Sequence, residues 1–458
     1  MKPDTRPAAP RNLQLDFFRG LALMIIFINH MPFNPWFDYT PSRLGPSDAA
    51  ETFVFLSGFA AAIAFGRSFK QAGLSLGSVR VLFRCSQIYL AHLMLFLLMS
   101  TLLVIVTSWD ENSAQWQLDN LRYFFDHTQA ALLALVSLRY VPNFIDILPM
   151  YLVIMLWLPM VWGLSRIHTL LALGFSVSLY LAAWYLGWEL PADPTSTRPW
   201  YFNPFCWQLV FFTGFAFGSG WLPIPAFSRS LGSVCLAYVV FCYPLENPFG
   251  YNQLPWFASF REHYEPLLNK SHLGILRYLH FLAMAYLVGG MMRKHAHHLQ
   301  NRWLKPVIAM GQQSLPIFIL GTCLSFLGGV ILNGSNAGLV DSAWVNIAGL
   351  GLMLLTAQLL NWLDEKPWKK IIQHSVHQAN ADWPKQAMLA FSLLCLSIIP
   401  LLFLQTQSDP LTMAATAIPE PDLAITGLED LTADTATQNT EAVAFQPDEQ
   451  QLDLPDTL

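Results

Sequence analysis

The stretch RGLALMIIFINHM, residues 19–31, decides the fold class of this chain. It is apolar almost throughout, with Arg19 at its start and Asn29 and His30 near its end. With the residues just before Arg19 it approaches the ~20 predominantly apolar residues that cross a bilayer as a helix. No small-x-small cleavage site follows it, so we expect a retained first transmembrane helix rather than a removed signal peptide.

The composition of the whole chain agrees with a membrane protein. Of its 458 residues, 54% are hydrophobic and only 12% are charged, whereas soluble domains carry roughly 25% charged residues. The net charge of −5 comes with no basic stripe outside the expected membrane loops, so the sequence gives no sign of nucleic-acid binding. The six cysteines form no CxxC pair, and we expect small buried side chains.

The apolar runs predict an all-α, polytopic integral membrane protein. We expect about eleven transmembrane helices, near residues 15–31, 47–66, 86–107, 144–163, 168–187, 205–222, 231–247, 272–292, 306–332, 343–363 and 386–405. A shorter run, 129–140, is expected to be interfacial or re-entrant. We therefore divide the chain into a transmembrane domain, 1–405, and an acidic C-terminal tail, 406–458, whose composition is typical of disorder.

Lysine and arginine are concentrated in every second predicted loop. They are frequent before the first span and in the even-numbered loops, while the odd-numbered loops are richer in acidic residues. The positive-inside rule then places the N-terminus in the cytoplasm. Eleven spans would place the acidic tail on the outer side.

Arg19 and His30 share one face of the first predicted helix. Eleven residues at 100° each make three turns and about 20°, over roughly 16 Å of helix axis. One helix face would therefore carry Arg19 near the inner side of the membrane and His30 near the outer side. Two alternatives stay open: Arg19 is a snorkelling anchor that pairs with Asp16, and His30 is an interfacial histidine at a helix end.

Asp48 and Glu51 enter the second predicted span at the depth of His30. Carboxylates inside a membrane are costly unless they are partnered, and a carboxylate beside an imidazole would orient it. The alternative is an acidic helix N-terminus. Further along, Gly58, Ala62 and Gly66 form a stripe of small residues that predicts close helix packing.

Other helices contribute polar side chains at the same outer depth. Together they predict a water-filled cavity open to the outside, although each alone is more often structural. These residues are Asp146, Asn203, Gln208, Arg277 and His280. On the inner side, Arg80, Arg84 and Arg293 form either a phosphate-binding patch or ordinary loop charge. No histidine or cysteine spacing predicts a metal site.

Four of these stretches carry a resemblance to a known family. They are LDFFRGLALMIIFINHM (15–31), SDAAETFVFLSGFAAA (47–62), RCSQIYLAHL (84–93) and LRYLHFLA (276–283). They resemble the OpgC family of periplasmic-glucan succinyltransferases, which is similar to the wider acyltransferase-3 superfamily. The shared mark is an Arg or Lys, ten residues and then a His, which Arg19 and His30 match. The resemblance extends over roughly residues 11–400.

The resemblance implies an O-acyltransferase of the bacterial inner membrane, with an acyltransferase-3-like helix bundle. The implied donor is cytoplasmic succinyl-CoA, a co-substrate rather than a tightly bound cofactor, and the acceptor is a hydroxyl of an osmoregulated periplasmic glucan. Some members are described with ten spans and both ends inside, which leaves ten as the alternative here.

Residue roles follow from this implied chemistry. A sugar hydroxyl needs a base, and an unperturbed histidine, with a pKa near 6.5, suits that task. His30 would be the base, Asp48 or Glu51 would orient it, and Arg19 would hold the donor. Arg80, Arg84 or Arg293 would take the nucleotide phosphates, and the five cavity residues would bind substrate.

Two other functions remain open. A transporter or flippase of a glycan would share the polar cavity without covalent chemistry, although no internal repeat is evident in the sequence. A structural partner in a glucan-synthesis complex is the third possibility.

Overall fold

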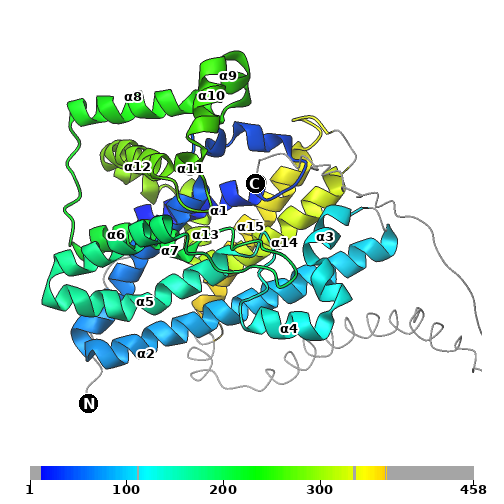
Figure 1. The fold of residues 1–458 in the computed structure, drawn as a ribbon, viewed down its shortest axis with the longest axis horizontal. Helices are drawn as coiled ribbons and strands as arrows, with labels where there is room; N and C mark the ends of the chain where they lie inside the picture. The colour runs from blue at the N-terminus through cyan, green and yellow to red at the C-terminus, as the bar shows by residue number, and fades with distance from the viewer. Residues whose placement is uncertain (1–11, 111–112, 334–336, 367, 369–458) are drawn as a thin grey trace, which may run out of the picture. The chain divides into compact units, whose positions relative to one another are not determined.

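The structure, a computed structural model, describes residues 12–110, 113–333, 337–366 and 368 (Figure 1). The described residues up to Glu365 belong to one compact unit. They form helices and contain no strand, apart from one isolated bridge between Pro191 and Pro199. The prediction of an all-α protein is confirmed for this part of the chain.

The helices follow one another along the chain, with the longest connections between α1 and α2 and between α6 and α7. They are α1 (Leu13–Asn29), α2 (Ala49–Trp109), α3 (Gln115–Asp126), α4 (Thr128–Val136), α5 (Ile147–Ile167), α6 (Thr169–Leu186), α7 (Pro204–Ser219), α8 (Arg229–Glu246), α9 (Pro248–Gln253), α10 (Pro255–His263), α11 (Glu265–Leu268), α12 (Ile275–His295), α13 (Lys305–Gln312), α14 (Ser314–Leu332) and α15 (Ala343–Asp364). Short 3₁₀ turns occupy Pro35–Tyr39, Pro41–Arg43, Ala296–Gln300 and Arg302–Leu304.

Six helices in the described residues are long and apolar enough to cross a membrane. They are α2, α5, α6, α12, α14 and α15, which supports a membrane protein. The count of eleven is not confirmed: α1, α7 and α8 lie at predicted spans but are not among the six. The predicted span 386–405 lies outside the described residues.

Helix α2 contains two of the predicted spans. It has 61 residues and is interrupted at Gly73, whose backbone has φ 79° and ψ 176°. A positive φ favours glycine because a Cβ would be strained there. The predicted spans 47–66 and 86–107 lie on either side of this kink.

Glycines bring α1 and α13 into backbone contact. A Cβ on Gly20 would overlap the carbonyl of Val307, and a Cβ on Gly311 would overlap the carbonyl of Asp16. Small residues allow such close approach between helices in membranes. The contact is reciprocal and therefore fixes α1, the helix that carries Arg19 and ends at His30, against α13.

A second reciprocal contact joins α2 and α7. A Cβ on Gly58 would overlap the carbonyl of Phe211, and a Cβ on Gly214 would overlap that of Phe55. Gly66 also lies in this region, against Trp162 of α5. The prediction that the small-residue stripe serves packing is confirmed at Gly58. These contacts position the N-terminal end of α2, where the two acidic residues lie.

We expect Gly311→Ala to lower the melting temperature of the purified protein. The added methyl group has no room against the α1 backbone, and overpacking typically costs ~1–3 kcal/mol. Gly351→Ala in α15 is the control, because nothing lies within 4 Å of a Cβ there, and alanine favours a helix over glycine. Equal melting temperatures for the two variants, measured in detergent, would contradict the close α1–α13 contact.

Candidate functional site

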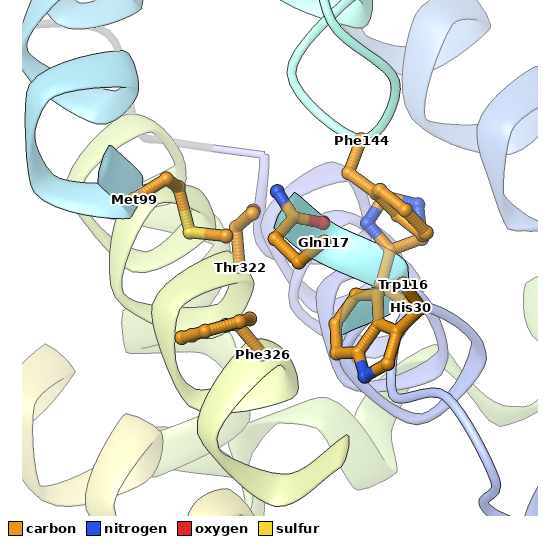
Figure 2. Close-up of a pocket in the computed structure, with 7 residues that line it drawn as sticks. All are labelled: His30, Met99, Trp116, Gln117, Phe144, Thr322 and Phe326. Atoms are coloured by element: carbon orange, nitrogen blue, oxygen red, sulfur yellow. The ribbon is translucent and has the colours of Figure 1, made fainter. Parts of the chain in front are cut away.

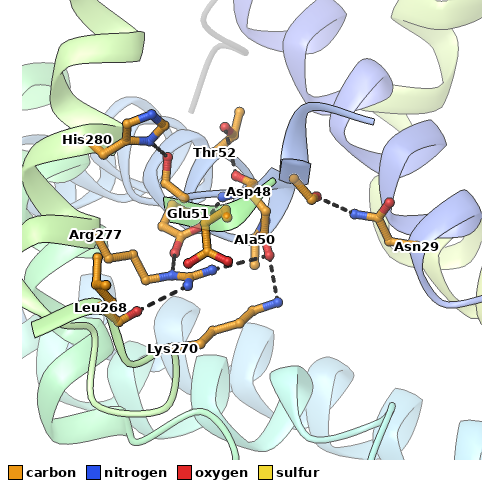
Figure 3. Close-up of polar contacts among 12 residues, drawn as sticks. Asn29, Asp48, Ala50, Glu51, Thr52, Leu268, Lys270, Arg277 and His280 are labelled. Atoms are coloured by element: carbon orange, nitrogen blue, oxygen red, sulfur yellow. Dashed lines mark hydrogen bonds and ion pairs between the residues drawn. The ribbon is translucent and has the colours of Figure 1, made fainter. Parts of the chain in front are cut away.

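Two carboxylates and two cations meet at the start of α2 (Figure 3). Glu51 Oε1 accepts a hydrogen bond from Arg277 Nε at 2.5 Å. Asp48 Oδ2 accepts from Lys270 Nζ at 2.6 Å and lies 3.4 Å from Arg277 Nη2. Glu51 is fully buried, at 0% exposure. Because an isolated charge is costly to bury, each group here depends on its partners.

The same carboxylates also begin the helix. Asp48 Oδ1 accepts from the Ala50 N–H at 2.7 Å, and Glu51 Oε2 accepts from the Asp48 N–H at 2.8 Å. This reciprocal arrangement is a capping box. The helix-cap alternative and the partnered-carboxylate prediction are therefore both correct for these two residues.

Lys270 reaches the cluster from the loop between α11 and α12. The Trp207 indole donates to the Lys270 carbonyl at 3.0 Å, and the Asn203 N–H donates to the Ser271 carbonyl at 3.2 Å. The start of α7 thus fixes the loop. The Lys270 ammonium also lies 5.8 Å from the ring centroid of Phe202, within the range of a cation–π contact.

Lys270 stays charged in this setting. Burial lowers the pKa of its ammonium, but the surrounding groups, with Asp48 foremost and Glu51 among them, together outweigh burial and raise the pKa above its usual value. The side chain is 22% exposed, so part of its length still faces solvent.

His280 lies one turn beyond Arg277 on α12. Its Nδ1 is 2.7 Å from the hydroxyl of Ser47, and within the described part of the chain its Nε2 has no hydrogen-bond partner. The prediction that Asp48, Glu51, Arg277 and His280 gather at one depth agrees with these contacts. Whether they bind substrate stays a prediction.

His30 lies in a small pocket at the end of α1 (Figure 2). The other lining residues are Met99, Trp116, Gln117, Phe144, Thr322 and Phe326. The imidazole contacts the Phe144 ring edge to face, with 5.8 Å between centroids. Its Nδ1 is buried and has no hydrogen-bond partner among the residues that the structure describes.

The carboxylates do not orient His30 in this structure. Asp48 and Glu51 take Lys270 and Arg277 as partners, and no hydrogen bond from either carboxylate to His30 occurs in the described ranges. The sequence predicts a similar depth for the three residues. It does not indicate that Lys270 and Arg277 pair with the carboxylates.

Asn203 and Gln208, predicted to line the cavity, are engaged by the protein. Asn203 caps α7 by accepting from the Phe205 N–H, and it donates to the Trp188 carbonyl at 2.7 Å. The Gln208 amide bonds both the hydroxyl and the carbonyl of Ser176, at 2.6 and 2.7 Å.

Asp146, predicted in the same cavity, lies directly before α5. It is 4% exposed, and its Oδ2 finds no partner among the described side chains and backbone. Unlike the two amides, this carboxylate therefore retains an unused hydrogen-bonding atom.

At the other end of α1, Arg19 contacts α14. Its Nη2 donates to the hydroxyl of Ser314, the first residue of that helix, and its guanidinium lies 5.9 Å from the Phe53 ring centroid. The predicted span 306–332 is broken here, because α13 ends at Gln312 and α14 begins at Ser314.

The basic residues assigned to phosphates have contacts of their own. Arg84 donates to Gln87 Oε1 at 3.0 Å, Arg80 donates to the Ala64 carbonyl at 3.2 Å, and Arg293 donates to the Pro225 carbonyl at 2.9 Å. Their role in donor binding stays a prediction.

A larger pocket lies between the first half of α2, α5 and α7. It has a volume of about 320 Å³, and its polar lining includes Arg67, Lys70 and Ser219. Neither Arg67 nor Lys70 forms an ion pair within the described residues.

No three His, Cys, Asp or Glu side chains in the described part of the chain are placed to hold a metal ion.

The sequence did not reveal Lys270, Trp116 or Gln117 as site residues. One signal was available for Lys270: a lysine in a predicted outer loop departs from the positive-inside pattern. Trp116 and Gln117 lie between the predicted span 86–107 and the short run 129–140, where no strong periodicity draws attention to single residues.

Comparison with known proteins gives one match. The model of the family described as OpgC protein matches residues 11–365. No curated protein and no solved structure matches the chain.

Proposed function

Since the chain belongs to the OpgC family, we propose that it is a membrane O-acyltransferase that transfers an acyl group from acyl-CoA to a hydroxyl of a glucan. The family match supports acyltransferase activity on glucans. The structural observation that carries the proposal is the pocket of His30, in which an imidazole with an unpartnered nitrogen lies among aromatic and polar side chains.

The proposed reaction needs one base. His30 removes the proton from the sugar hydroxyl while the oxygen attacks the thioester carbonyl. The carbon–oxygen bond forms, the carbon–sulfur bond breaks, and the proton passes from the imidazolium to the leaving thiolate of CoA. Atoms and charge balance without any further reactant.

Succinyl is the acyl group that best suits the cluster at the start of α2. A succinyl group carries a free carboxylate at neutral pH. Lys270 is a charged, 22% exposed cation beside Asp48, and cations of this kind bind carboxylates through charge-assisted hydrogen bonds. We propose that Lys270 contacts the distal carboxylate of the donor's acyl group.

The donor would approach from the Arg19 end of α1. Roughly 16 Å of helix axis separates Arg19 from His30, and a pantetheine arm spans such a length. Among the basic sites, the pocket of Arg67 and Lys70 has the room for a phosphate group. Arg84 remains a second proposed contact for the nucleotide phosphates.

We further propose eleven spans in the inner membrane of a bacterium, with the N-terminus in the cytoplasm and the acidic tail in the periplasm. Helices α1, α7 and α8 would then cross together with the six apolar helices, α2 crossing twice, and the predicted span 386–405 would be the eleventh. This arrangement presents one end of α1 to each side of the membrane.

A glycan transporter is the second candidate, because one predicted span is interrupted. Within 306–332, α13 ends at Gln312 and α14 begins at Ser314. Discontinuous helices often line transport sites.

The decisive experiment supplies succinyl-CoA labelled in its succinyl carbons to vesicles that contain the purified protein and glucan. We expect the label to appear on the glucan as an alkali-labile ester. Vesicles without protein are the control. Glucan that crosses the membrane unlabelled would favour transport and contradict the proposed transfer.

A further inference from the structure

Three polar atoms in the pocket of His30 have no hydrogen-bond partner. They are His30 Nδ1, Trp116 Nε1 and Gln117 Oε1, and for each the absence refers to the residues that the structure describes. A buried polar group without a partner costs about 1–3 kcal/mol. A polar group the size of a hydroxyl that entered the pocket would complete their hydrogen bonds.

Gln117 departs from the pattern of its own helix. Among the residues of α3, Gln117 and Leu121 are the two buried side chains, four positions apart on one face. Leu121 is the apolar residue expected on such a face, whereas Gln117 is an amide at 2% exposure. A residue such as Gln117, which lowers stability without an evident structural gain, is expected at a functional position.

The size of the pocket limits what can enter it. The space in which the centre of a water molecule fits is about 10 Å³, which is room for one water-sized group. Its apolar walls include Met99, Phe144 and Phe326. A whole sugar ring does not fit, but the hydroxyl group alone does, so the carbon that carries it would have to lie outside this space.

The chemistry of the lining selects a neutral hydroxyl. No lysine or arginine lines the pocket in the described residues, and the Gln117 oxygen would repel a carboxylate or phosphate. A hydroxyl donates one hydrogen bond and accepts others. It can accept from the Trp116 indole and donate to Gln117 Oε1 or to the imidazole of His30.

We propose that this pocket binds the reacting hydroxyl of the acceptor sugar, presented on a hydroxymethyl arm, and that Trp116 and Gln117 are its binding residues. This inference rests on the proposed function. Figure 2 shows the Gln117 amide in the centre of the group, between Thr322 on one side and Phe144 with His30 on the other. The hydroxyl oxygen accepts from the Trp116 indole, and its single proton is held by Gln117 Oε1 in the resting complex. The proton then turns to His30 Nδ1, which takes it as the oxygen attacks the acyl carbon.

The test compares Gln117→Leu with the wild type in equilibrium binding of labelled glucan and in acyl transfer. We expect binding of glucan to weaken about tenfold, in keeping with the loss of one hydrogen bond that the ligand satisfies. The apparent KM for succinyl-CoA should not change. The melting temperature should stay the same or rise, because leucine replaces an unsatisfied buried amide.

Gln115→Leu is the matched control, since Gln115 is an exposed glutamine on the same helix. It should leave glucan binding, transfer and melting temperature unchanged. Trp116→Phe keeps an aromatic ring but removes the indole N–H, and it should also weaken glucan binding.

The two proposals fail in different ways. Wild-type protein that binds glucan but transfers no label contradicts the acyltransferase, while the binding arm still tests the pocket. If Gln117→Leu melts at a lower temperature and binds glucan like the wild type, Gln117 is a structural residue and the pocket proposal is overturned. Wild-type protein that does not bind glucan overturns it as well.

Discussion

We expect His30→Ala to lower the rate of acyl transfer to glucan by at least a hundredfold and to leave the protein folded. A general base typically contributes 10²–10⁴-fold to the rate, and no other histidine lines the pocket in the described residues. The buried Nδ1 makes no hydrogen bond within the described chain, so its removal breaks no such bond. The rate is measured with labelled succinyl-CoA, and folding is measured from the melting temperature.

Succinyl-CoA binding separates a base from a binding residue. A base acts mainly in the transition state, so His30→Ala should bind the donor like the wild type. His127→Ala is the control, because His127 is an exposed histidine at the end of α3. Transfer at the wild-type rate in His30→Ala would exclude it as the base and leave the interfacial-histidine alternative.

Arg277→Met is expected to destabilise the protein by ~3–5 kcal/mol, the usual cost when one partner of a buried ion pair is removed. It leaves Glu51, at 0% exposure, without the guanidinium that bonds it at 2.5 Å. The free energy of unfolding in detergent, or the yield of folded protein in the membrane, reports the loss.

The double variant Glu51→Gln with Arg277→Met should recover part of this stability, because it removes both charges together. Arg122→Met is the matched control: Arg122 pairs with Asp119 on the surface of α3, with both side chains 57% exposed, and such pairs contribute ~0–1 kcal/mol. If Arg277→Met is as stable as the Arg122 variant, the cluster does not hold α2 and α12 together.

The partner of Glu51 could be predicted from the sequence, because a charged residue in an apolar run needs an opposite charge nearby. A carboxylate at a membrane depth needs a cation, and Arg277 was a candidate at the same expected depth. The structure pairs them over 226 positions of sequence. Lys270 was missed because it lies in an irregular loop, where no periodicity indicates which way a side chain points.

The number and continuity of the helices were harder to predict. Hydropathy treats 306–332 as one run, but α13 and α14 meet at Gln313 within it. It separates 47–66 from 86–107 correctly, because the backbone leaves the helical conformation at Gly73 between them. Backbone breaks depend on contacts between neighbouring helices, which a hydropathy window does not contain.

Gln117 shows the same limit at the scale of one side chain. The sequence places it in a short segment of mixed polarity, and an exposed glutamine would fit there equally well. Its burial follows from the packing of α3, which lines the pocket together with α1 and α14. The site beside His30 is therefore visible in the structure and hidden in the sequence.

The ion pair of Glu51 and Arg277 also sets the order of events during biosynthesis. A ribosome adds roughly 5–20 residues per second, so the 226 positions between the two residues take roughly 11 to 45 s. For that time the nascent chain holds the carboxylates of α2 without the guanidinium that neutralises Glu51. The first half of the protein therefore enters the bilayer as an unfinished assembly, and this cluster closes after α12 has been synthesised.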